Sequence, residues 1–185
     1  MHYEEYLRHW GASNLTRWSR RALSGAMISE SSRAFLEIAG LPPTEHILGL
    51  DYRWQETLPL RGEGRRVLGI YDKRVPLLLD ETAGGCVIRL NSPPLPGSTR
   101  AWYPESWYNS SVEQFAQFLT EFDMFFKSPE HRAVLSTIGD ERMTPRFSQQ
   151  IEMLERRLAK IDSAAVDRNG PWSILLWETQ TGITD

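Results

Sequence analysis

The sequence predicts an α+β protein in which N-terminal and C-terminal helices pack on a central, mostly antiparallel sheet. Three observations support this prediction. Apolar residues recur every three or four positions in both terminal parts of the chain, strand-like runs occupy much of residues 51–108, and turn-forming residues separate these runs. No internal repeat breaks this order, so we expect the helices and the sheet to form separate layers.

The length and composition of the chain suit a single globular domain. It has 185 residues, of which 41% are hydrophobic and 24% are charged, and we expect residues 1–185 to form one domain. The first six residues include two glutamates and lack the basic start of a signal peptide. No apolar run approaches the roughly 20 residues that span a bilayer, and the single cysteine, Cys86, fits a reducing compartment. We therefore expect a soluble, cytoplasmic protein with no membrane partner.

Negative charge is concentrated in the second part of the chain. Residues 101–185 contain 8 lysines and arginines and 13 aspartates and glutamates, a net charge of −5, whereas the whole chain carries −3. A nucleic-acid groove needs clustered positive charge, so we expect no nucleic-acid partner. The distribution mildly favours a basic protein partner, and an acidic surface that only promotes solubility explains it equally well.

Short helices are expected before residue 43. The spacing of Tyr3, Leu7 and Trp10 predicts a first helix with these residues on one face, and residues 15–23 predict a second. A third begins near Ser31 and ends at Gly40, because a glycine after the last apolar residue, followed by prolines, is typical of a helix end.

Strands are expected in the middle of the chain. Four runs, over residues 52–58, 67–71, 75–79 and 86–90, predict an antiparallel meander, and a fifth strand over 100–108 follows a proline-rich loop over 92–98. Pro76 has no backbone N–H to donate, so its strand should lie at a local edge of the sheet or start late.

The last third of the chain predicts helices with marked starts. Ser110 precedes Glu113 by three residues, as in a capping box, and opens a helix whose apolar stripe holds Val112, Phe115, Leu119, Phe122 and Phe126. Ser128-Pro129 starts a short helix and Thr144-Pro145 a longer one, with the stripe Phe147, Ile151, Leu154, Leu158 and Ile161. Residues 171–179 predict a helix that ends near Gly182, and a terminal strand is the alternative.

No motif typical of a metal site or a covalent catalyst is present. The four histidines, His2, His9, His46 and His131, are far apart in the sequence, and Cys86 lies in an apolar run where a thiol is usually a small buried hydrophobe. Neither a nucleophile elbow nor a phosphate-binding loop occurs. We therefore expect no cofactor, no metal ion and no enzyme activity.

Carboxylates on or beside the predicted sheet leave one catalytic alternative open. Paired acids about 5 to 9 Å apart can act as general acid and base, which would make the chain a hydrolase. Asp72 and Asp80 stand where turns begin, a place that aspartate favours because it bonds its own backbone, so the structural interpretation is preferred.

The aromatic content, with seven Trp, six Tyr and seven Phe, indicates a binding role. Trp10, Trp172 and Trp177 lie on helix faces that should be core. Further aromatic residues lie in predicted strands beside polar residues, where such side chains often anchor protein interfaces: Trp54, Trp102, Tyr103, Trp107 and Tyr108. With the acids of the same sheet, they predict a partner-binding surface made of Asp51, Trp54, Glu56, Asp72, Asp80, Glu81, Trp102 and Tyr103.

Several short segments, taken in order, resemble a known family. They are Gly40-Leu41-Pro42, residues 68–72, 77–80 and 85–87, Asn109-Ser110-Ser111 with the following phenylalanines, and residues 172–182. Over roughly residues 35–182 the chain resembles the bacterial SUKH immunity proteins of the fourth group. It departs from them at Trp107-Tyr108 and in the proline-rich segment 92–98.

This resemblance implies a SUKH-like, non-enzymatic α+β domain that protects its producer by binding a toxin domain, often a nuclease or a deaminase, encoded beside it. It transfers no toxin-contacting residues, so the surface predicted above comes from the acids and aromatic residues of the sheet alone. A basic nuclease would be attracted to acidic groups. We expect a monomer or weak homodimer, and a regulatory adaptor of the same fold that binds an endogenous protein is the main alternative.

Overall fold

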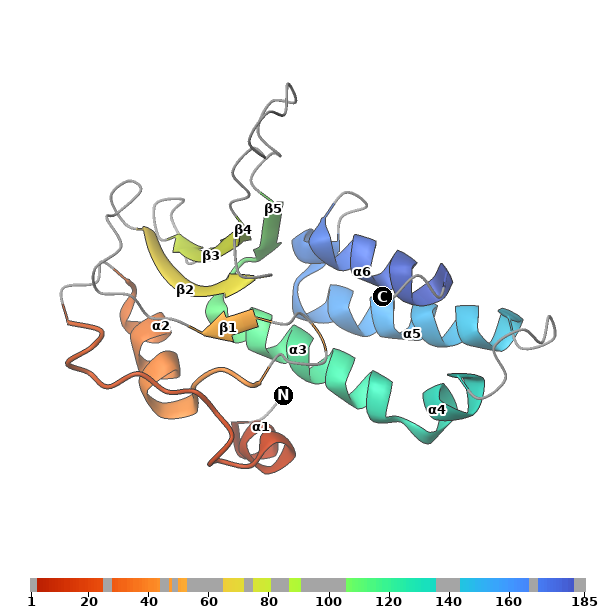
Figure 1. Cartoon of the computed structure of the whole chain (residues 1–185), viewed down its shortest axis with the longest axis horizontal. Coiled ribbons are helices and arrows are strands. Elements are labelled where there is room, and N and C mark those ends of the chain that lie inside the picture. The colour runs from red at the N-terminus through yellow and green to blue at the C-terminus, as the bar shows by residue number, and fades with distance from the viewer. Residues whose placement is uncertain are drawn as a thin grey trace, which may run out of the picture.

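A computed structural model describes residues 3–24, 28–43, 47, 50–52, 65–71, 75–80, 87–90, 106–135, 144–166 and 170–181. These residues form helices and one antiparallel sheet, so the predicted α+β class is confirmed. Figure 1 shows the sheet at one end of the molecule and the long helices α3, α5 and α6 at the other, with α3 running from beneath the sheet into the helical part.

Six α-helices and two other helical turns are described. They are α1 (Tyr3–Trp10), α2 (Glu30–Ala34), the π-helical η1 (Phe35–Ala39), α3 (Val112–Lys127), α4 (Pro129–Leu135), α5 (Thr144–Ile161), the 3-10 turn η2 (Ser163–Val166) and α6 (Pro171–Thr181). The strands are β1 (Leu50–Tyr52), β2 (Arg65–Tyr71), β3 (Val75–Asp80), β4 (Val87–Leu90) and β5 (Ser106–Asn109).

The sheet is a meander in chain order, β1-β2-β3-β4-β5, and all its pairs are antiparallel. Pro76 pairs with Ile70 of β2, while the pairing of β3 with β4 begins only at Leu77. The proline therefore lies at a local edge, as predicted, although β3 is the middle strand. Of the strand predicted over 52–58 only Tyr52 lies in β1, and residues 53–58, 91–105 and Cys86 lie outside the described residues.

The predicted helix over residues 15–23 is wrong. This segment forms turns, and Thr16 makes an antiparallel bridge with Leu41 through hydrogen bonds of 2.9 and 2.8 Å. Its apolar residues Leu15, Trp18 and Leu23 are nevertheless buried. Pairing with a distant segment has overridden the local helical spacing, as tertiary contacts often do.

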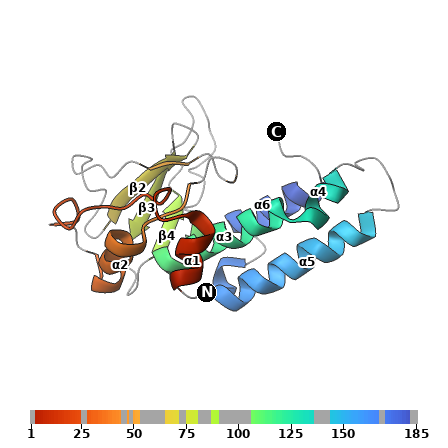
Figure 2. The ribbon, with the colours of Figure 1, turned by 90° about the horizontal axis from the view of Figure 1, so that it is seen from below.

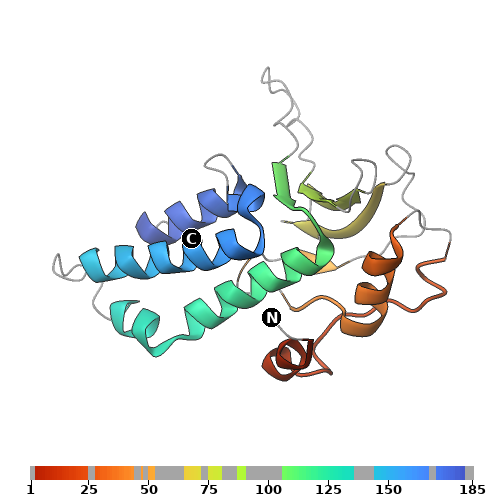
Figure 3. The same cartoon turned by 180° about the vertical axis from the view of Figure 1, so that it is seen from behind.

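Helix α1 packs on α3 and not on the sheet. Figures 2 and 3 place α1 on the side of α3 that faces away from the strands. Tyr6 and Trp10 form its buried face, whereas Tyr3 is 43% exposed, so the predicted face is rotated by about one position. Helix α3, by contrast, contacts β4 and β5 directly.

The core is centred on Trp172 of α6, which is fully buried. Its ring lies 5.2 Å from the rings of Tyr108, Phe118 and Phe122, measured between centroids. The indole thus joins β5, α3 and α6, and such aromatic clusters contribute more than their buried area alone. Because Tyr108 is part of this cluster, it is a core residue and not one of the interface anchors considered among the strand aromatics.

Helix α6 confirms the predicted helix over residues 171–179, not the alternative strand, and corrects the prediction for Trp177. Trp172 and Leu176 are four residues apart and face the core, while Ile174 and Trp177 share another face and are 52% and 56% exposed. Residues three or four apart lie on one side of a helix. Trp177 follows Trp172 by five residues and therefore does not share its buried side.

The start of α3 differs from the predicted capping box by one residue. Ser111 is the N-cap, and its hydroxyl accepts from the backbone N–H of Gln114 at 3.1 Å. Ser110 instead bonds Asp162, and Asn109 accepts from the Trp172 indole at 3.0 Å. The stripe of α3 is buried as predicted up to Phe122, with Phe126 partly buried, and that of α5 is buried at Ile151, Leu154 and Leu158.

Among the described residues, no helix is long and apolar enough to cross a membrane.

Candidate partner-binding site

Two residues of the predicted partner-binding surface lie in the described strands, and the register keeps them apart. Asp51 of β1 is level with Ile70 of β2 and therefore with Pro76 of β3. Asp80 lies four residues farther along β3, which places its Cα about 13 Å away along the strand direction alone. The other predicted residues, Trp54, Glu56, Asp72, Glu81, Trp102 and Tyr103, lie outside the described residues.

The helical side of the molecule carries a concave site that the sequence did not predict. Helices α1, α2 with η1, and α3 surround a cavity of about 420 Å³, which we call the apolar pocket. Its walls are Tyr3 and Tyr6 of α1, Ser31, Ala34, Phe35, Ile38 and Ala39 of α2 and η1, and Glu113, Ala116 and Gln117 of α3.

The tyrosines of α1 form one wall of the pocket because their hydroxyl groups are fixed on the opposite wall. The Tyr3 hydroxyl donates to the Ile38 carbonyl at 3.1 Å, and the Tyr6 hydroxyl donates to the Gly40 carbonyl at 2.8 Å. Burial raises the pKa of Tyr6 well above its usual range, and nearby Arg17 opposes this only in part, so the hydroxyl keeps its proton.

Helix η1 leaves an apolar side chain exposed at the rim of the pocket. π-helical turns are rare and occur frequently at functional sites. Leu36 and Ala39 are buried, whereas Ile38 is 57% exposed. The turn ends at Gly40, whose φ of +77° favours glycine, and a Cβ there would lie 2.4 Å from the Thr16 carbonyl oxygen. The bridge between Thr16 and Leu41 therefore fixes where η1 ends.

A second hollow, the charged groove, lies on the other side of α1. It encloses about 600 Å³ and is lined by Glu5, Arg8 and His9 of α1, Gln117, Glu121 and Met124 of α3, and Arg157, Lys160 and Ile161 of α5. Arg157 pairs with Glu121 at 3.3 Å. Gln117 lines both hollows, so α1 forms a ridge between them.

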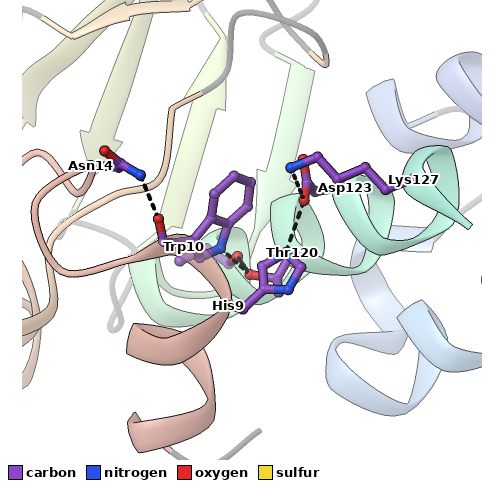
Figure 4. A network of polar contacts seen from close by, with 7 residues as sticks. His9, Trp10, Asn14, Thr120, Asp123 and Lys127 are labelled. Carbon is purple, nitrogen blue, oxygen red and sulfur yellow. Dashed lines mark hydrogen bonds and ion pairs between the residues drawn. The ribbon is translucent and has the colours of Figure 1, made fainter.

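A polar network holds this ridge on α3 (Figure 4). Asp123, whose side chain is 1% exposed, binds the His9 ring and the Lys127 ammonium group at 2.9 Å each. The Trp10 indole donates to the Thr120 hydroxyl at 2.9 Å. A buried carboxylate needs such partners to offset its lost hydration, so these bonds give α1 a defined position.

His131, unlike the partly exposed His9, is buried, and it belongs to the core. It packs against the rings of Phe125, Phe126 and Phe147 at centroid distances of 4.7, 5.3 and 5.8 Å. Burial lowers its pKa below the usual value, so the ring is neutral at pH 7. Within the described ranges, no group of three histidine, cysteine, aspartate or glutamate side chains is placed to hold a metal ion.

One sequence signal could have pointed to the apolar pocket. Four of the five residues over 35–39 are apolar, which is more than one face of a short helix can bury. An exposed apolar side chain was therefore foreseeable in this segment. The partners that complete the pocket, α1 and α3, come from distant parts of the chain, and no local pattern connects them.

Comparison with known proteins agrees with the resemblance seen in the sequence. The family model described as SUKH-4 immunity protein matches residues 4–178, almost the whole chain. No curated protein and no solved structure matches the chain. Because this match covers almost the whole chain, including every described strand, the chain belongs to the SUKH-4 immunity protein family.

Proposed function

We propose that this protein binds a cognate bacterial toxin domain directly and neutralises it without catalysing a reaction. The observation that carries the proposal is the match to the SUKH-4 immunity protein family over residues 4–178, since that family implies toxin immunity in general. Direct contact is the simplest mechanism for a domain that offers a preformed concave surface, because rigid hollows are typical binding sites.

The charge distribution supports a basic toxin domain, of the nuclease or deaminase type. The second part of the chain has a net charge of −5, and complementary charge speeds association and selects partners. The protein would act as a single domain. It would work in the cytoplasm, where it meets a toxin made by the same cell.

The sheet residues predicted from the sequence are a second proposed contact surface. Asp51 and Asp80 can be tested first, because their strand positions are known. Asp51→Asn and Asp80→Asn together would weaken toxin binding if this surface takes part. The hydrolase alternative is tested by Asp72→Ala with Asp80→Ala, since an enzyme that used these acids would lose activity while keeping its fold.

The proposal is tested by expressing the toxin encoded beside this gene in a bacterial host, with and without this chain. Survival only in the presence of the chain, together with a stable complex of the two purified proteins, is the expected result. Equal killing in both cultures would contradict it and favour the regulatory adaptor, for which a pull-down should then recover an endogenous partner.

A further inference from the structure

We infer that the apolar pocket receives one large apolar side chain that projects from a positively charged segment of the bound toxin domain. The inference rests on the proposed function and adds to it the surface used and the chemistry of the group that occupies it. Shape, rigidity and charge of the described residues each support it.

The size and lining of the pocket suit an aromatic or long aliphatic side chain. Ligand-binding cavities are commonly about 300–1,000 Å³, and the 420 Å³ here is far larger than a packing defect. The tyrosine hydroxyl groups are already bonded to the carbonyls of Ile38 and Gly40, so Tyr3 and Tyr6 line the cavity mainly with their rings. Such pockets receive the anchor residues of protein interfaces.

The pocket is preorganised, so filling it requires little ordering of side chains. Its α1 wall is held by the bond from Tyr6 to Gly40 and by the bond from Trp10 to Thr120, both of which are buried. The opposite wall is fixed at Gly40, where Thr16 allows no side chain. Rigid sites of this kind bind more tightly because less conformational entropy is lost.

Three carboxylates, two of them exposed and that of Glu37 half-buried, belong to the helices around the pocket and point to a basic occupant. Glu113 lines the cavity, whereas Glu37 and Glu4 are next in the sequence to the lining residues Ile38 and Tyr3. Among the described residues, no ion pair reaches any of these three. Their field therefore acts outward and attracts positive charge.

One basic side chain reaches the rim of the pocket: the Nε of Arg17 donates to the Ile38 carbonyl at 2.8 Å, so its single charge offsets one of the three carboxylates. The basic groups of α1, α2 and α3 themselves lie elsewhere. Arg8 and His9 line the charged groove on the other side of α1. Arg33 of α2 donates to the Leu23 carbonyl and pairs with Glu30, and Lys127 pairs with Asp123 at the far end of α3. An apolar side chain flanked by lysine or arginine fits these surroundings better than one flanked by acids.

The first test compares Ile38→Glu with Ile174→Glu. Both isoleucines are more than half exposed, and Ile174 lies on α6, outside the residues that line the pocket. The new glutamate at position 38 would have to lose its hydration when an apolar side chain enters, although its charge attracts a basic partner. A loss of affinity would then report on the pocket and not on repulsion.

Binding is measured by surface plasmon resonance with the toxin domain encoded beside this gene, made inactive by mutation. Ile38→Glu should weaken binding by about 30-fold, chiefly through faster dissociation, whereas Ile174→Glu should change it by less than about twofold. Ile38→Ala, which adds no charge, should bind about 10-fold more weakly. It replaces Ile38→Glu in the test if the glutamate variant does not fold.

The second test concerns charge. Glu37→Gln with Glu113→Gln should slow association and reduce its dependence on salt. The control, Glu152→Gln with Glu155→Gln, removes the same net charge from the exposed side of α5 and should leave the association rate within about twofold of the unmodified protein.

The outcomes separate this inference from the proposed function. If the unmodified protein does not bind the toxin domain, the proposed function fails and this inference fails with it. If the unmodified protein binds and the folded Ile38 variants bind equally well, the pocket is empty in the complex and the inference alone is overturned. Equal losses for Ile38→Glu and Ile174→Glu would also overturn it.

Discussion

Asp162 accepts hydrogen bonds from both the backbone N–H and the hydroxyl group of Ser110, at 2.7 and 3.1 Å. Asp162 directly follows α5, and Ser110 directly precedes the N-cap of α3, so this one carboxylate ties the two longest helices together. Asn109 extends the link, because its amide lies 3.4 Å from the same carboxylate while its oxygen accepts from Trp172. The three residues Asn109-Ser110-Ser111 thus have three different structural tasks.

Replacing Asp162 by alanine should lower the free energy of unfolding by about 3 kcal/mol, because hydrogen bonds to a buried carboxylate are lost and the Ser110 donors are left unpaired. Asp162→Asn keeps a hydrogen-bond acceptor, so its free energy of unfolding should fall by less. Urea unfolding followed by circular dichroism measures both. Glu155→Ala, at an exposed position of α5, is the control and should change stability by less than about 0.5 kcal/mol. Equal values for all three variants would contradict the role assigned to Asp162.

Gly40→Ala should destabilise the protein much more than Gly11→Ala. Both glycines have φ near +75°, but a Cβ at Gly40 would lie 2.4 Å from a backbone oxygen, whereas at Gly11 it would lie 3.3 Å from the flexible amide of Asn14. Strain from positive φ alone costs about 1–2 kcal/mol, so we expect that loss at Gly11 and at least about 3 kcal/mol at Gly40. Thermal unfolding of the two variants decides the matter, and similar melting temperatures would count against the close approach.

The two tryptophans of α6 should respond differently to truncation. Trp172→Ala removes the centre of the aromatic core and should cost about 3–5 kcal/mol. Trp177→Ala changes a side chain that is more than half exposed and should cost less than about 1 kcal/mol. The two variants are compared by the urea concentration at the midpoint of unfolding, with the same dependence of the unfolding free energy on urea for both. A larger loss at Trp177 would indicate that its side chain, and not that of Trp172, belongs to the core.

His131 should make the protein less stable as the pH falls. Burial lowers the pKa of the folded-state ring, so below about pH 6.5 the unfolded chain binds the proton more readily than the folded one. The loss amounts to at most about 1.4 kcal/mol per pH unit and ceases once the pH passes below the folded-state pKa.

The variant His131→Phe keeps an aromatic ring among Phe125, Phe126 and Phe147 and cannot be protonated. Unfolding of both proteins by urea should therefore be measured from pH 8 to pH 5. The advantage of the variant should grow as the pH falls below about 6.5, and subtraction cancels the carboxylates that the two proteins share. A difference that stays constant over this range would show that His131 does not titrate as described.

The helices that follow residue 110 could be predicted from the sequence because their signals are local. The stripe from Val112 to Phe122 and the starts at Ser128-Pro129 and Thr144-Pro145 depend only on spacing and end chemistry. The errors arose where a distant partner decides the structure. Thr16 pairs with Leu41, which removes the predicted helix over 15–23, and Asp162 engages Ser110, which moves the cap to Ser111.

The candidate site was harder to predict than the fold. Acidic and aromatic residues drew attention to the sheet, where Asp51 and Asp80 lie far apart by register. The apolar pocket depends on Ile38 being outside the core and on α1 crossing α3, and neither is encoded in a local pattern. Hydrophobic residues on short helices are ordinarily assigned to the core, which is correct for Leu36 and wrong for Ile38.

The docking of α1 has a kinetic consequence. The strands join their neighbours in chain order, but the bonds of α1 close loops of 34 residues to Gly40 and 110 residues to Thr120. Long loops are entropically slow to close, so α1 should be the last helix to dock during folding and the first to detach in transient opening. The apolar pocket then exists only in the fully closed molecule, and a bound partner should slow amide hydrogen exchange in residues 3–10 more than in the sheet.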